Sequence, residues 1–264
     1  MIYYLTFFLV VGSLTVLSIK WELDKKISVF WALIMGACAC LIVAVLQAGH
    51  FDISPPLQVL ISVSSATLLT FAAMLGLFFR DPERTPPAEQ GVIVSPADGI
   101  VKYVKEIQHN EFPFAVKNGR RIPLTAFTEL DMIQNGGIQV GIGMSLLNVH
   151  VTRSPIAGEL SYLKRVPGKF KSLKNISSLL ENERVVGVIK GATSNIGIVL
   201  IASRLVRRIV MRLKEGQSVV IGQRIGMIRF GSQVDILIPK NASLKITVVP
   251  GEKVRAGETI IAGI

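Results

Sequence analysis

Residues 27–49, ISVFWALIMGACACLIVAVLQAG, contain no Asp, Glu, Lys or Arg. Two further runs without these residues lie on either side, at 2–19 and 57–79. A helix of about 20 apolar residues is long enough to cross a hydrocarbon core of about 30 Å. The three runs therefore predict a membrane anchor of three transmembrane helices within residues 1–79, followed by a separate domain of residues 80–264.

The polar loops between these runs predict an orientation. The loop at residues 20–26 carries three lysines, whereas residues 50–56 carry no Lys or Arg. Positively charged loops tend to stay in the cytoplasm. We therefore expect the lysine loop and everything after Phe79 on the cytoplasmic side of the inner cell membrane. A signal peptide is less favoured for the first run, because it has no basic start and no clear small-residue cleavage site.

The charge balance indicates an anionic partner. Lys and Arg outnumber Asp and Glu by 29 to 18, which gives a formal net charge of +11, and the whole excess lies from position 80 onward. No zinc-finger spacing is present, and no basic run is interleaved with aromatic residues. We therefore favour a phospholipid membrane over a nucleic acid as the partner. The only cysteines, Cys38 and Cys40, lie in an apolar run, so neither a disulfide framework nor a metal site is expected.

From Gly91 onward, short β-rich runs are broken by Gly, Pro and Asn. Residues 91–107 predict a hairpin around an Asp-Gly turn, because this dipeptide favours tight turns. Residues 138–144 alternate apolar with small or polar side chains, which predicts a half-buried strand. For residues 177–183 we expect a short helix or a loop. Residues 196–211 are apolar and β-branched, and the segment RLVRR within them, at 204–208, fits either a strand or a helix.

The pattern G-x-x-V-x-x-G-x-x-I occurs twice, at residues 216–225 and 251–260. It predicts two β-turns leading into strands, as in the barrel-sandwich folds that carry biotinyl and lipoyl groups. Neither copy has a convincing lysine at a hairpin tip, which those carriers need. The expected fold is therefore a set of transmembrane helices followed by a mainly β (α+β) domain of barrel-sandwich character. The repeat supports this fold and assigns no function by itself.

Few residues in the chain carry an obvious chemical role. The sequence has no P-loop, no G-x-S-x-G and no H-E-x-x-H motif. Of the three histidines, only His150 lies at the end of an alternating strand, yet a lone histidine is more often structural than catalytic. The same discount applies to Asp98, because an aspartate before glycine can serve its turn alone, and the pair Gly231-Ser232 has no meaning in isolation.

Taken together, however, these segments carry a resemblance. SPADG at 95–99, VHVTRSP at 149–155 and RFGSQVD at 229–235 resemble, in this order, the motifs of phosphatidylserine decarboxylase proenzymes of the short branch. Three more segments are similar to parts of the same family: FRDPER at 79–84, PGKF at 167–170 and ENER at 181–184.

The resemblance implies a self-cleaving enzyme. The chain would be cut between Gly231 and Ser232 into a β chain ending at residue 231 and an α chain of residues 232–264. Ser232 would become a covalent pyruvoyl group, the cofactor, with no metal. This group would bind the substrate amine as a Schiff base and act as an electron sink, so that phosphatidylserine loses carbon dioxide and becomes phosphatidylethanolamine. The family's catalytic Asp and His map onto Asp98 and His150.

Two departures from the long-branch pattern affect the expected roles. A second histidine of those relatives corresponds to Arg153 here, and an aspartate corresponds to Asn148. Because arginine stays protonated in proteins, Arg153 cannot be the base. The resemblance therefore suggests Arg153 as a partner of the substrate phosphate or carboxylate, with Asn148 also in the substrate site, and it leaves the base for self-cleavage open.

Two other functions stay open at this point. One is a membrane-tethered lipoyl-like carrier or adaptor, and the other is a lipid-binding module without enzymatic activity. Both predict an intact chain of 28.7 kDa. The sequence fixes neither the lipid backbone nor homo-oligomerisation.

Overall fold

The protein divides into two compact units, Met1–Arg80 and Asp81–Ile264, each described here by itself. The structure is a computed structural model. It describes residues 1–20, 25–49, 53–108, 114–117, 120–123, 136–167, 183–202, 208–229 and 233–264. The predictions for Gly231, Ser232 and residues 177–182 lie outside these ranges.

The first unit consists of three helices, α1 (Ile2–Lys20), α2 (Lys25–Ala48) and α3 (Pro55–Phe78). All three are long and apolar enough to cross a membrane, which confirms the three predicted helices. The third begins at two consecutive prolines, where the missing backbone N–H groups would have no intrahelical partner.

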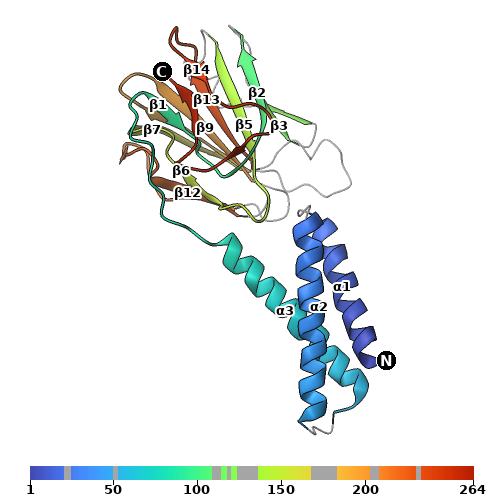
Figure 1. The fold of residues 1–264 in the computed structure, drawn as a ribbon. Helices are drawn as coiled ribbons and strands as arrows, with labels where there is room; N and C mark the ends of the chain where they lie inside the picture. The colour runs from blue at the N-terminus through green and yellow to red at the C-terminus, as the bar shows by residue number, and fades with distance from the viewer. Residues whose placement is uncertain are drawn as a thin grey trace. The chain divides into compact units, whose positions relative to one another are not determined.

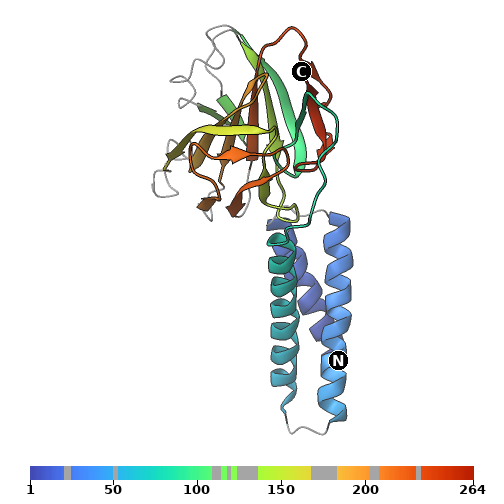
Figure 2. The same cartoon turned by 90° about the vertical axis from the view of Figure 1, so that its left-hand side faces the viewer.

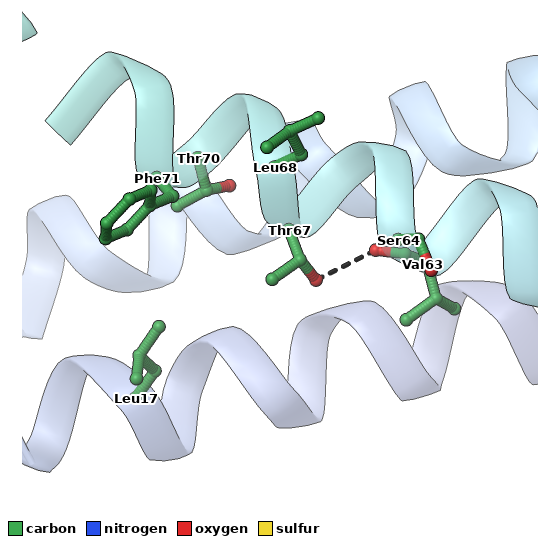
Figure 3. Close-up of a pocket in the computed structure, with 7 residues that line it drawn as sticks. All are labelled: Leu17, Val63, Ser64, Thr67, Leu68, Thr70 and Phe71. Atoms are coloured by element: carbon green, nitrogen blue, oxygen red, sulfur yellow. Dashed lines mark hydrogen bonds between the residues drawn. The ribbon is translucent and has the colours of Figure 1, made fainter. Parts of the chain in front are cut away.

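Packing within this unit uses small residues and leaves much apolar surface outside. Gly36 of α2 lies against α1, so close that a Cβ there would be 2.9 Å from the Phe7 ring. Both cysteines are free, with Cys38 exposed and Cys40 partly buried. A shallow pocket between α1 and α3 is lined by Leu17, Val63, Ser64, Thr67, Leu68, Thr70 and Phe71 (Figure 3). The unit therefore presents apolar side chains outward, as expected of helices in lipid.

The second unit is built from β-strands (Figure 1). Its described strands are β1 (Val92–Val94), β2 (Gly99–Ile107), β3 (Phe114–Lys117), β4 (Arg120–Pro123), β5 (Gly137–Gly143), β6 (Val151–Arg153), β7 (Gly158–Val166), β8 (Arg184–Lys190), β9 (Asn195–Ile201), β10 (Arg208–Met211), β11 (Ser218–Val219), β12 (Arg224–Arg229), β13 (Gln233–Pro239), β14 (Lys245–Ile246), β15 (Lys253–Val254) and β16 (Ile260–Gly263).

One large sheet dominates this unit. Its strand order is β11-β7-β8-β9-β13-β5-β2-β15, and smaller sheets have the orders β10-β12-β6, β1-β16-β14 and β3-β4. All pairings among the described strands are antiparallel. The large sheet curls, so that its long strands bend around the shorter ones (Figure 2). Strand-rich structure after apolar helices is therefore confirmed.

Side-chain alternation places one apolar core inside the curl. Val140 and Ile142 of β5 and Val234 and Ile236 of β13 are fully buried in the same cluster as Ile228 of β12. The predicted alternating strand at 138–144 is thus confirmed as β5. Residues 195–201 and 208–211 form strands β9 and β10, whereas the ambiguous segment at 204–208 lies, except for Arg208, outside the described residues.

The predicted hairpin at 91–107 is wrong. Strand β1 pairs with β16, whereas β2 pairs with β5 and β15. The turn between β1 and β2 carries the chain from one sheet to another instead of reversing it within one. An Asp-Gly dipeptide favours a tight turn locally, but strand partners are decided by long-range contacts that this preference does not contain.

The structure extends the repeat that the sequence shows. Val219 of the first copy pairs with Gly158, and Val254 of the second pairs with Gly99. Gly99 and Gly158 each end a Ser-Pro-x-x-Gly turn, at 95–99 and 154–158. The turns are joined reciprocally: the Val94 N–H donates to Pro155 O at 3.0 Å, and the Arg153 N–H donates to Pro96 O at 2.9 Å. The domain therefore contains two similar halves that contact one another at these turns.

We predict that Gly158→Ala lowers the free energy of unfolding by about 1–3 kcal/mol, the usual cost of overpacking. A Cβ at position 158 would lie 2.2 Å from the Lys190 carbonyl oxygen, a backbone atom that cannot move aside. Gly263→Ala is the control, because a Cβ there meets nothing within 4 Å. Urea unfolding of the detergent-solubilised protein measures both variants. Equal stability of the two would contradict the close approach.

Candidate active site

Asp98 is held in the turn between β1 and β2. The Ser95 hydroxyl closes this turn by donating to the Ala97 carbonyl oxygen at 2.7 Å. At its end, Gly99 lies so close to β5 that a Cβ would be 2.4 Å from the Gly143 carbonyl oxygen. Asp98 is buried, with 7% of its surface exposed. The backbone therefore fixes where the carboxylate points.

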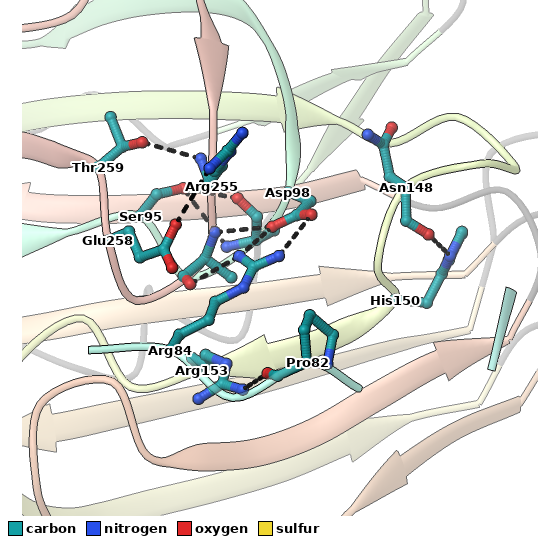
Figure 4. Close-up of polar contacts among 12 residues, drawn as sticks. Pro82, Arg84, Ser95, Asp98, Asn148, His150, Arg153, Arg255, Glu258 and Thr259 are labelled. Atoms are coloured by element: carbon teal, nitrogen blue, oxygen red, sulfur yellow. Dashed lines mark hydrogen bonds and ion pairs between the residues drawn. The ribbon is translucent and has the colours of Figure 1, made fainter. Parts of the chain in front are cut away.

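Arg84 binds this carboxylate with both terminal nitrogens (Figure 4). The Nη1 and Nη2 groups donate to Oδ1 and Oδ2 of Asp98 at 2.5 and 2.9 Å, respectively. The amide of Ala256 also donates to Oδ1 of Asp98, at 2.8 Å. The hydrogen bond with Asp98 raises the pKa of Arg84. Both oxygens of the carboxylate thus accept hydrogen bonds, and two of the three donors belong to the Arg84 guanidinium.

The segment that contains Arg84 also holds Arg153. Nη2 of Arg153 donates to Pro82 O at 2.8 Å and lies 3.3 Å from Oδ1 of Asp81. Asp81 accepts a further bond from Nε of Arg224 at 2.8 Å. Residues 81–84, here called the bridging segment, therefore connect the Asp98 turn to the strand that carries Arg153.

Arg224 binds the bridging segment at a second point. Its Nη2 donates to Glu83 at 2.6 Å. This bond holds the pKa of the Glu83 carboxyl below its usual value. Hydrogen bonds to Glu83 and Asp81 raise the pKa of Arg224. Because Glu83 is highly exposed, we expect this contact to contribute little to stability.

Arg153 lies in the interior of the domain. Only 3% of it is exposed, and its Nη1 donates to Gly222 O at 3.0 Å. Burial lowers the pKa of Arg153, and the nearby charge of Arg224 adds to this effect. Arginine nevertheless keeps its proton in proteins. Its buried Nε–H has no acceptor in the described part of the chain, so one donor of this cation is left for a further group.

His150 precedes β6 and is fully buried. Its Nδ1 lies 2.8 Å from the carbonyl oxygen of Asn148. A carbonyl oxygen can only accept, so Nδ1 carries the proton and Nε2 is the basic atom of the ring. The Asn148 side chain accepts from the amide and hydroxyl of Ser145 at 2.7 and 2.8 Å, which stabilises the preceding turn.

The backbone of His150 contacts the strand that leads to the expected cleavage position. The Ile228 amide of β12 donates to the His150 carbonyl oxygen at 3.2 Å. Strand β12 ends at Arg229 and β13 begins at Gln233. Residues Gly231 and Ser232 connect these two strands and lie outside the described residues.

The structure joins only some of the residues that the sequence singles out. Asp98 and Arg153 are joined through the bridging segment and through the Arg153–Pro96 backbone bond. The Asp98 oxygens bind Arg84 and Ala256. The His150 ring lies beside Asn148, apart from Asp98 and Arg153 (Figure 4). The described residues contain no group of three or more His, Cys, Asp or Glu side chains suited to a metal ion.

Sequence reasoning missed the role of Arg84. The FRDPER segment at 79–84 carries part of the family resemblance, which assigned no partner to its second arginine. The Arg84 side chain is buried to all but 7% of its surface and paired with Asp98. The sequence offered one signal for such pairing. Acidic and basic residues alternate in this segment, and each can form an ion pair with a residue far along the chain.

Three apolar helices followed by a β domain that buries an Asp–Arg pair and a histidine are features of a membrane-associated enzyme. Comparison with known proteins makes this class specific. A family model described as phosphatidylserine decarboxylase matches residues 71–262. A phosphatidylserine decarboxylase proenzyme of Chlorobium luteolum is 42% identical over 204 residues, which are 76% of this chain and 85% of that protein.

Two further relatives agree with this match. A phosphatidylserine decarboxylase proenzyme of Erythrobacter litoralis is 39% identical over 194 residues, 71% of this chain and 72% of that protein. A protein provisionally named archaetidylserine decarboxylase proenzyme, from Methanocaldococcus jannaschii, is 39% identical over 203 residues, 76% of this chain and 93% of that protein. The chain belongs to the phosphatidylserine decarboxylase family, whose members are decarboxylases made as proenzymes.

We predict that Arg84→Met lowers the free energy of unfolding by about 3–5 kcal/mol, the cost of leaving a buried charge without its partner. Arg84→Met combined with Asp98→Leu should lose less than Arg84→Met alone, because no buried charge then remains. Arg224→Met is the control, since that side chain is 27% exposed. Urea unfolding in detergent measures all three variants. A loss for Arg84→Met no larger than that for Arg224→Met would contradict the importance of the pair.

Proposed function

We propose that this chain is a self-cleaving proenzyme that decarboxylates phosphatidylserine to phosphatidylethanolamine through a pyruvoyl group made from Ser232. Family membership supports the reaction. The observation that carries the proposal is the position of His150. Its backbone is bonded to β12, the strand that runs into Gly231-Ser232, and its ring has a basic Nε2.

The residues present fit a pyruvoyl group. Pyruvoyl formation needs a serine whose hydroxyl can attack the carbonyl of the preceding residue, and the dipeptide Gly231-Ser232 supplies both groups. The strands before and after this dipeptide are both paired within the domain, β12 with β6 and β13 with β5 and β9. A buried imidazole on the β6 side is the base that such an attack needs.

Maturation follows from these groups. Nε2 of His150 accepts the proton of the Ser232 hydroxyl, and the oxygen attacks the Gly231 carbonyl carbon, which exchanges the amide for an ester. Loss of the α-proton of residue 232 then breaks the ester and frees a chain ending in the Gly231 carboxylate. Water adds to the dehydrated residue 232 and ammonia leaves, so that position 232 becomes the pyruvoyl group. In the mature enzyme, a pyruvoyl group at position 232 would supply an electrophilic carbonyl for the substrate amine and an electron sink for the loss of carbon dioxide.

Asp98 holds the turn at 95–99 in place through its hydrogen bonds with Arg84 and the Ala256 amide. A catalytic role of Asp98 beside His150 stays a prediction. A contact of Arg153 with the substrate phosphate or carboxylate stays a prediction, supported by its Nε–H, which meets no acceptor among the residues that the structure describes. A substrate contact of Asn148 likewise stays a prediction.

We further propose that residues 1–79 anchor the enzyme and that residues 80–264 form the catalytic domain on the cytoplasmic side. The apolar helices support membrane association, and the lysine loop at 20–26 supports the orientation. The β chain would end at residue 231 and the α chain would span 232–264. Homo-oligomerisation and a lipoyl-like relationship of the repeated turns stay predictions.

We predict two chains in the purified protein, split between residues 231 and 232. The α chain should carry a pyruvoyl N-terminus, because its first residue loses its amino group. Intact mass spectrometry decides this, and an α chain that begins with an ordinary serine amine would exclude the pyruvoyl group. Ser232→Ala should stay a single chain without activity, whereas the control Ser243→Ala, at an exposed turn, should mature normally. An intact wild-type chain would favour the carrier or adaptor function.

We predict that His150→Ala slows self-cleavage by about 10²–10⁴-fold, the usual contribution of a general base. Arg153→Lys should behave differently, because it keeps a positive charge beside Asp81 and was never the base. It should cleave at the normal rate and show a KM for phosphatidylserine raised about 10- to 150-fold, through loss of one charge-assisted hydrogen bond. Cleavage is measured on denaturing gels and turnover on micellar lipid. An Arg153→Lys protein that stays uncleaved, together with normal maturation of His150→Ala, would reverse the two assignments.

A further inference from the structure

A second buried polar group lies in the large sheet, on the face opposite the apolar core. It consists of Tyr103, Gln139, Gln233 and Asp235, here called the Asp235 cluster. Oδ2 of Asp235 accepts from the Tyr103 hydroxyl at 2.5 Å and from Nε2 of Gln139 at 2.7 Å. Nε2 of Gln233 donates to Oδ1 of Asp235 at 2.7 Å and to the Tyr103 hydroxyl at 3.1 Å. None of these contacts was expected from the sequence.

The sheet is shaped to let Tyr103 reach Asp235 across an intervening strand. Tyr103 of β2 and Asp235 of β13 are both in register with Gly141 of β5, which lies between them. The Tyr103 ring lies over this glycine, because a Cβ at position 141 would be 2.4 Å from the ring. A register shift in β2 between Val101 and Tyr103 precedes the tyrosine. Gly141 and the bulge in β2 thus together allow the Tyr103 hydroxyl to reach Asp235.

The cluster lies among buried apolar residues of the sheet. Asp235 and Gln139 are fully buried. The residues that pair with the cluster from β9, Val199 and Ile201, are also fully buried and apolar. At a buried position, well-packed apolar side chains often stabilise a fold as well as polar groups do. A polar network in which every group is hydrogen-bonded has a different effect, because it favours one arrangement of the chain around it.

The location of the cluster in the chain indicates which arrangement it specifies. Gln233 is the residue directly after Ser232, and Asp235 follows two positions later. The Gln233 backbone is in register with Gly143 on one side and Ile201 on the other. Cleavage between 231 and 232 removes the covalent link on the N-terminal side of residue 232. After this step, its position depends on Gln233 and on whatever holds Gln233.

We propose that the Asp235 cluster holds the first residues of the mature α chain, so that residue 232 is correctly positioned for decarboxylation. The four side chains are positioning residues in the second reaction, acting through Gln233. This inference rests on the proposed self-cleavage. It assigns the cluster little part in cleavage itself, because the precursor holds residue 232 by peptide bonds on both sides.

The direct test is Tyr103→Phe, which removes one hydroxyl and keeps the ring over Gly141. We expect normal cleavage and a normal KM for micellar phosphatidylserine. The kcat per pyruvoyl group, counted by intact mass spectrometry, should fall about 10- to 100-fold, the effect of a small misplacement of a reacting group. Gln233→Met, which removes both bonds of that side chain, is a second variant and should show the same division between kcat and KM.

Tyr162→Phe is the matched control. Tyr162 occupies the corresponding place in the other half of the domain, after the register shift between Leu160 and Tyr162 in β7. Its hydroxyl is buried and has no hydrogen-bond partner among the described residues. This variant should keep the wild-type kcat and KM.

Three outcomes would overturn the inference. The first is an unchanged kcat per pyruvoyl group in both Tyr103→Phe and Gln233→Met. The second is a loss confined to cleavage, and the third is an equal loss in Tyr162→Phe. Failure of the proposed function is recognised separately, because a wild-type protein without a pyruvoyl group would show it before any variant is compared.

Discussion

Two backbone hydrogen bonds between the Ser-Pro turns, Val94 N–H to Pro155 O and Arg153 N–H to Pro96 O, determine how the two halves of the β domain meet. Through them, the Asp98 turn lies against the strand of Arg153. The bridging segment adds side-chain contacts across the same junction, with Arg84 on Asp98 and with Asp81 and Pro82 on Arg153. A buried ionic centre can form here because each charge meets a partner at the place where the backbones are already fixed.

The proposed cleavage position, between Gly231 and Ser232, lies in the chain between two strands that are held differently. On one side, β12 pairs with β6 and carries the amide that binds the His150 carbonyl oxygen. On the other side, β13 is hydrogen-bonded to both β5 and β9, and the Asp235 cluster holds its first residues. In the account proposed here, the β12 side supplies the base for maturation and the β13 side keeps residue 232 in place afterwards. In this account, the connection between β12 and β13 takes part first in self-cleavage and then in decarboxylation.

Local patterns predicted the parts of this structure that depend on local physics. The charge-free runs predicted the three helices, and alternation at 138–144 predicted β5. Partners far apart in sequence were not predictable in this way. Nothing local indicates that Arg84 pairs with Asp98 or that β1 pairs with β16. The burial of Asp235 was not predictable either, because alternation separates the two faces of a strand without showing that the second face is buried as well.

The central claim is that residue 232 carries the carbonyl that binds the substrate amine. Incubation of the mature enzyme with phosphatidylserine and sodium cyanoborohydride tests it most directly, because reduction fixes the amine permanently to the carbonyl carbon. Mass spectrometry of the separated chains then locates the lipid. The account predicts an adduct on residue 232 of the 232–264 chain and none in Ser232→Ala. An adduct on the 1–231 chain, or none on either chain of an active enzyme, would contradict it.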